Sequence, residues 1–95
     1  MSNIEIILKQ KIQDLGEFLI SICNDDNKKK DIQESLIGIP TYKILLFISF
    51  LDLNKVNEQI NDLINLFQLN DNTENRDKIK EYINYFIQVK DIINN

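Results

Sequence analysis

One stretch of the chain is apolar almost without interruption, and it reads Ile44-Leu45-Leu46-Phe47-Ile48-Ser49-Phe50-Leu51. Leaving such a run in water would cost roughly 25 cal/mol for each Å² of apolar surface. We therefore expect this stretch to be buried on most sides and the other segments to wrap it. Its β-branched and aromatic content would also suit a buried strand, and periodicity alone does not separate the two. Because no second strand candidate exists to pair with it, we interpret residues 41–52 as a helix.

The segment before this stretch has the apolar spacing of a long helix. Apolar side chains recur at intervals of four and three over residues 3–23, which predicts one buried stripe. That stripe is Ile4, Leu8, Ile12, Leu15, Leu19 and Ile22. Ser2 and Glu5 form a capping box at its start. Gly16 costs about 1 kcal/mol relative to Ala inside a helix, and two interpretations stay open: it permits close approach of a neighbouring helix, or it is tolerated sequence drift.

Two further helices are expected after the central stretch. The first is capped by Asp52 or Asn54 and runs to about residue 69, with one apolar and one polar face. The second is capped by Asn72 or Thr73. Its stripe is Ile79, Tyr82, Ile83, Phe86, Val89 and Ile93. The short connection predicts that these two helices are antiparallel neighbours.

Residues 24–31 contain no apolar side chain, and we interpret them as a solvated loop. The segment fails as a calcium-binding loop, because Lys30 and Leu36 stand where such a loop, counted from Asp25, needs glycine and an acidic residue. Asp31 is then expected to cap a short helix that Gly38 ends.

Residues 32–47 resemble a helix-turn-helix pattern, with Gly38 in the turn. Two features count against DNA binding. Glu34 occupies a position where close packing of two helices needs a small residue. The would-be recognition helix carries Lys43 as its only charge, although base reading needs several polar or basic side chains. We expect these residues to form a corner that supports the core.

Chain length and composition limit the folds that are possible. A chain of 95 residues has the size of one domain, 1–95, and two Gly with one Pro are too few for a turn-rich β fold. The prediction is an all-α protein: a small bundle of four main helices plus one short helix, ending in an antiparallel helical hairpin. Frequent Ile, Asn and Lys, with Ala, His and Trp absent, indicate an AT-rich genome, such as that of a bacterium, a phage or plasmid, a protist or a large DNA virus.

Location is predicted from what the chain lacks. No signal peptide is recognisable, which predicts a cytoplasmic protein. The longest apolar run, residues 36–51, is shorter than the roughly 20 residues that a bilayer needs, and Pro40 and Lys43 interrupt it. We expect no membrane span.

The side chains argue against catalysis. The chain has no His, so the commonest general base and the commonest neutral metal ligand are both missing. Cys23 is the sole cysteine, which excludes an intrachain disulfide and a cysteine-based zinc site. We interpret Cys23 as a small buried side chain near a helix end. No glycine-rich phosphate loop is present. The prediction is a protein that is not an enzyme and that has no cofactor or metal.

Binding remains as the function. Tyr42, Tyr82 and Tyr85 are candidate partner-binding residues because Tyr is enriched at interfaces, and the run 28–30 (Lys28, Lys29 and Lys30) is a candidate basic contact. Surplus apolar residues predict a protein partner or a homodimer. With a net charge of −4, the chain suits a small acidic inhibitor or neutralising protein of the immunity-protein or phage type. The alternatives are a helix-turn-helix-like regulator of nucleic acid, although an acidic chain is expected to repel it, and a self-assembling structural or adaptor subunit.

Overall fold

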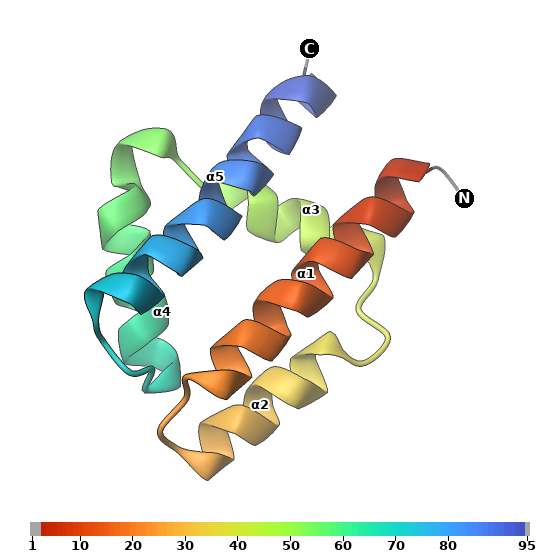
Figure 1. Ribbon diagram of the computed structural model, residues 1–95. Helices are drawn as coiled ribbons and strands as arrows, with labels where there is room; N and C mark the ends of the chain where they lie inside the picture. Colours follow the sequence, from red (N-terminus) through yellow and green to blue (C-terminus); the bar gives the residue numbers. More distant parts are fainter. Residues whose placement is uncertain (1–2, 95) are drawn as a thin grey trace.

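The computed structural model describes residues 3–94, and over that range the protein is all-α (Figure 1). The elements are α1 (Asn3–Ser21), α2 (Asp26–Leu36), α3 (Thr41–Phe50), the 3-10 turn η1 (Leu53–Lys55), α4 (Val56–Phe67) and α5 (Thr73–Asn94). The all-α prediction is confirmed. Ser2 of the expected capping box lies outside the described residues. No helix in the described range is long and apolar enough to cross a membrane.

Helices α1 and α5 are the two long elements, and the side chains of the core pack on them. Figure 1 shows the start of α1 and the end of α5 on the same side of the molecule. Helix α1 packs against α2 and α3, and α5 packs against α3 and α4. The side chains that are most completely buried are Leu8, Ile44, Ile79, Ile83 and Phe86. The centre of the core is therefore formed by members of the stripes predicted for the first and last helices together with Ile44 of α3.

The first predicted stripe is buried only in part. Its middle is buried from Leu8 to Leu19, whereas Ile4 at the start of α1 is exposed. The helix ends at Ser21 instead of residue 23, because the chain there turns into a short antiparallel bridge. Backbone hydrogen bonds join Asn24 N to Gln68 O at 2.9 Å and Asn70 N to Ile22 O at 2.7 Å.

The solvated loop expected at residues 24–31 is wrong. Helix α2 already begins at Asp26, and its N-cap is Asp25 instead of the predicted Asp31. The Asp25 carboxylate accepts a hydrogen bond from the Lys28 backbone N–H at 2.9 Å, which satisfies one of the free donors of the first turn. The absence of apolar residues showed correctly that this turn faces water, but a solvated helical turn has the same composition as a solvated loop.

The burial expected for residues 44–51 is also wrong. The stretch is helical, as predicted, but only its Ile44, Ile48 and Leu51 side chains are buried, whereas Leu46 and Phe50 are exposed. A helix of ten residues presents only part of its circumference to its neighbours α1 and α5. An almost uniformly apolar sequence on such a helix therefore leaves apolar side chains in water.

Side chains from other helices hold the end of α3 in place. Lys90 Nζ donates to Leu51 O at 2.9 Å and to Ser49 O at 3.3 Å. Gln59 Nε2 donates to Phe50 O at 2.7 Å. Carbonyls at a helix C-terminus have no partner within the helix, and a cation near them is also favoured by the helix dipole. These bonds fix α3 against α4 and α5 and hold its exposed face in one orientation.

The start of the last helix agrees with the sequence prediction. Asn72 Oδ1 accepts a hydrogen bond from the Asn75 backbone N–H at 2.8 Å, as one of the two proposed N-caps should. The preceding residue, Asp71, pairs with Arg76 through two hydrogen bonds of 2.6 and 3.0 Å. The Arg76 guanidinium lowers the pKa of the Asp71 carboxyl.

Candidate functional site

The exposed face of α3 carries an apolar strip. Tyr42, Leu46 and Phe50 are 66%, 54% and 70% exposed, and they follow one another at intervals of four residues. Side chains spaced by four lie above one another on a helix, so these three form one continuous strip, which we call the α3 ridge. Leu53, in the turn after α3, is 68% exposed as well. Contiguous exposed apolar surface of this kind marks interaction sites on soluble domains.

An apolar groove lies beside the ridge. Its inner part is a hollow of about 310 Å³ that residues of α1, α2, α3 and α4 line, and Ser35 is the one polar residue among them. Its outer part is a hollow of about 460 Å³ between α3 and α4. Phe47, Leu63 and Leu66 line both hollows, so the two are direct neighbours, and we call them together the α3–α4 groove. Phe50 belongs both to the ridge and to the outer hollow.

Gly16 shapes the inner end of the groove. A Cβ atom at this position would collide with the Leu36 side chain, so the glycine lets α2 pack directly on the α1 backbone. Gln13 Nε2 also donates to Leu36 O at 3.0 Å and so holds the end of α2 on α1. The prediction that Gly16 permits close approach of a helix is confirmed. The presence of Gly16 did not, however, lead to the prediction of a groove beside it.

Charged residues line only the outer hollow. Glu58 and Asp62 stand one turn apart on α4, and Lys55 precedes them in η1. The groove thus combines an apolar lining with a rim on which carboxylates outnumber cations. No pair of a nucleophile and a base is among these residues, and the arrangement suits binding of an apolar side chain more than bond-making chemistry.

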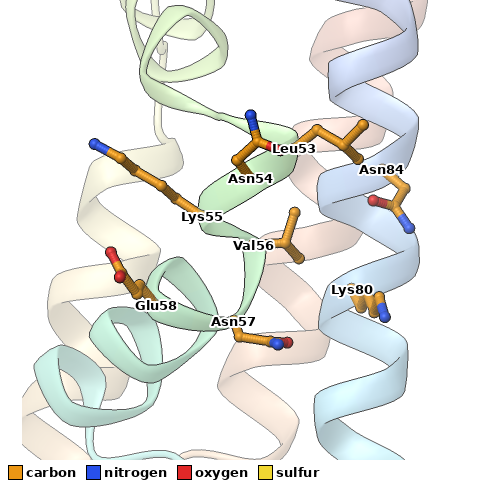
Figure 2. A pocket seen from close by; sticks show the side chains of 8 residues that line it. All are labelled: Leu53, Asn54, Lys55, Val56, Asn57, Glu58, Lys80 and Asn84. Carbon is orange, nitrogen blue, oxygen red and sulfur yellow. The ribbon is translucent and has the colours of Figure 1, made fainter.

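A third hollow, of about 470 Å³, lies where α4 begins beside α5 (Figure 2). Its lining is mostly polar, with Lys55, Glu58 and Lys80 as its charged residues. The Asn84 side chain lies on α5 across from Leu53 in Figure 2, and its buried Oδ1 has no hydrogen-bond partner among residues 3–94. Open polar hollows of this kind give water a place to bind, and no side-chain arrangement here points to a particular ligand.

Two of the predicted tyrosines come together. Lys11 Nζ of α1 lies 4.5 Å from the ring centre of Tyr85 and 5.9 Å from that of Tyr82, which is cation–π geometry. Tyr82 also stacks on Phe18 with ring centres 6.3 Å apart. Burial raises the pKa of the Tyr82 hydroxyl, and the negative charges of Asp14, Glu17 and Glu81 add to the rise. Both tyrosines are half-buried, and the contacts of Tyr82 and Tyr85 with Lys11 and Phe18 join α1 to α5.

The remaining predicted binding residues lie elsewhere. Tyr42 is on the α3 ridge, whereas Lys28, Lys29 and Lys30 are in α2. Consecutive helical residues point about 100° apart, so the three lysines do not share one face. Lys29 is 3.8 Å from the Asp26 carboxylate. The six predicted positions therefore belong to at least three separate surfaces.

Cys23 lies at the bridge between the ends of α1 and α4. Its side chain is buried, as predicted, and its Sγ donates to Phe67 O at 3.0 Å and to Asp25 O at 3.3 Å. Among residues 3–94, no three Asp, Glu or Cys side chains converge as metal ligands.

Comparison with known proteins adds no relative. No protein-family model matches the chain, and neither a curated protein nor a solved structure is significantly similar to it.

Proposed function

We propose that the chain is a non-enzymatic protein-binding domain that inhibits or neutralises a partner protein through the α3 ridge. One observation carries this proposal: Tyr42, Leu46 and Phe50 expose more than half of their surface along a single helical strip. Large aromatic side chains dominate the binding energy of protein interfaces. Of the six candidate residues from the sequence, Tyr42 is the one on this strip.

The negative net charge of the chain favours a partner whose binding surface is basic. The net charge of −4 speeds encounter with positively charged grooves, such as those that bind nucleic acids or acidic substrates. An inhibitor that covers such a groove needs apolar anchors for affinity and negative charge for orientation. Both are available on this molecule.

The exposed face of α3 gives little support to the nucleic-acid alternative. The helix that would have to read bases presents the ridge and one cation, Lys43. The two helices of the helix-turn-helix pattern are α2 and α3, and they pack mainly on other helices: α3 on α1 and α5, and α2 on α1 and α4. Base reading depends on Arg, Lys, Asn or Gln at successive exposed positions. An apolar strip in their place favours a protein surface.

The experiment is photo-crosslinking from the ridge. A benzoylphenylalanine replaces Phe50, or in a second variant Leu46, and the protein is irradiated in the cells that produce it. The control carries the same residue at Gln88, which is exposed on α5. We expect one discrete product with a different protein from positions 50 and 46 and none from position 88, and the identified partner should lose activity when the purified protein is added. A product with the mass of two copies would instead favour self-assembly, and no product from either ridge position would refute the proposal.

A further inference from the structure

We infer that the α3–α4 groove binds an amphipathic helix of the partner, with a bulky apolar side chain in the inner hollow and cationic side chains beside Glu58 and Asp62. This inference rests on the proposed function, because it specifies the chemistry of the surface that meets the ridge. The proposed function needs only the ridge, whereas this inference assigns a class of ligand to the groove beside it.

The shape of the groove favours a helix. Its two hollows are neighbours that share Phe47, Leu63 and Leu66 in their linings, so apolar side chains line both the inner hollow and the outer hollow at the edge of the ridge. Helices bind such grooves by placing apolar residues at intervals of three and four along one face. The inner hollow, of about 310 Å³ and almost wholly apolar, suits one large anchor side chain.

The charges on the rim define the other face of the bound helix. Glu58 and Asp62 are four residues apart on α4, so they lie about one helical turn apart on the same side. Cations with that same spacing on a helix beside α4 would meet both carboxylates. Lys55 is the one cation among the residues that line the outer hollow, which leaves its lining net acidic.

The same carboxylates disfavour the other occupants. A second copy of the chain would bring an identical acidic rim and a further net charge of −4, while its α3 offers only Lys43 in exchange. A fatty acid or an anionic membrane would place negative charge near Glu58 and Asp62. Like charges brought together on binding cost free energy. A basic helix is the occupant that both the lining and the rim favour.

The test uses defined peptides with the intact protein. The probe is an amphipathic helix of Leu and Lys, capped at both ends, with its apolar residues at intervals of three and four. One comparison peptide replaces every Lys by Glu, and another scrambles the Leu/Lys order so that no apolar face forms. We expect saturable binding of the first peptide, with amide chemical-shift changes at Phe47, Leu63 and Leu66, and affinities at least about tenfold weaker for the other two.

Matched variants separate the lining from the rim. Glu58→Gln with Asp62→Asn should weaken binding of the Leu/Lys peptide about three- to tenfold, the range expected for two exposed ion pairs, and should reduce its salt dependence. Asp77→Asn with Glu81→Gln removes the same charge at the same spacing from α5 and should leave affinity unchanged. Leu66→Asn should abolish binding. Leu66 is 59% exposed, so this variant is expected to fold, which circular dichroism checks.

Several outcomes would overturn the inference. Equal binding of the Leu/Lys and Leu/Glu peptides, or equal loss in the α5 control, would remove the role of the rim. A doubled mass in light scattering that Phe50→Ser returns to one copy would assign the groove to a second copy, and saturable binding of palmitate there would assign it to a lipid. If the peptides fail while ridge crosslinking still finds a partner protein, only this inference falls. If both fail, the proposed function falls with it.

Discussion

Two side chains on α3 provide a direct test of how this helix is oriented. Ile44 is 0% exposed and Leu46 is 54% exposed, although the two residues are nearly the same size and stand two positions apart. In a uniformly buried stretch, truncating either one to Ala would destabilise the protein by a similar amount. With the observed orientation, Ile44→Ala and Leu46→Ala should differ several-fold.

The magnitudes follow from the buried area. Ile44→Ala removes three buried carbons at about 0.8 kcal/mol each, or about 2.4 kcal/mol, and the cavity left behind raises this to about 3–4 kcal/mol. At Leu46 about half of the side chain is already in water, so the transfer loss is about 1 kcal/mol. Water fills the space at the surface, and no cavity term is added there.

Urea unfolding followed by circular dichroism measures both changes. We expect equal m-values, a midpoint that falls much further for Ile44→Ala, and Tm shifts of roughly 15 °C or more for Ile44→Ala against about 5 °C for Leu46→Ala. Ile48→Ala, a second buried position on α3, should match Ile44→Ala. Equal costs at Ile44 and Leu46 would mean that α3 is buried on both faces, and the ridge would not exist as a binding surface.

Two other changes test the contacts around α3 and between α1 and α5. Lys90→Met keeps most of the aliphatic chain but removes the donor to Leu51 O, so it should lower the free energy of unfolding by about 1–2 kcal/mol in urea melts. The control Lys80→Met should change the free energy of unfolding by less than about 0.5 kcal/mol. Equal effects of the two substitutions would mean that the hydrogen bond from Lys90 to the end of α3 contributes nothing to stability. Absorbance titration of the wild type minus Tyr82→Phe should give a phenol pKa above the ordinary 10.0, because burial and the nearby carboxylates disfavour the phenolate. Since the raised pKa belongs to the folded state, the Tyr82 contribution to stability is complete below about pH 10 and is lost as the pH rises through the folded pKa. Tyr82→Phe should therefore be less sensitive to alkaline unfolding than the wild type. A titration midpoint of the Tyr82 phenol at or below 10.0 would contradict the burial of this ring.

Sequence reasoning succeeded where a local pattern has one structural meaning. The last helix has Asn72 before its first turn as expected, and Ile79, Ile83, Phe86 and Val89 of its predicted stripe are buried, whereas Ile93 near its end is 44% exposed. It failed at residues 24–31 because composition reports exposure to water but does not separate a loop from a solvated helical turn. The carboxylate of Asp25, placed three residues before Lys28, decides between them.

The candidate site was less predictable for a different reason. Hydropathy shows that residues 44–51 favour burial, but it does not show how much of a short helix its neighbours can cover. The groove is assembled from side chains of four successive helices, spread from Ile12 to Phe67, and no local pattern describes such a space. Gly16 was the one visible signal, since a glycine inside a helical stripe indicates that another element comes close.

The bridge between residues 23 and 69 makes the chain into a closed loop that contains α2, α3 and α4, with the long helices α1 and α5 outside its two ends. Closing a loop of that length costs on the order of 3 kcal/mol of chain entropy, so the bridge should persist only while the helices around it are packed. The only thiol of the protein is buried at this junction. The rate at which a thiol reagent labels Cys23 therefore reports how often the loop opens, and a bound partner that holds α3 and α4 together should slow that labelling without touching the sulfur.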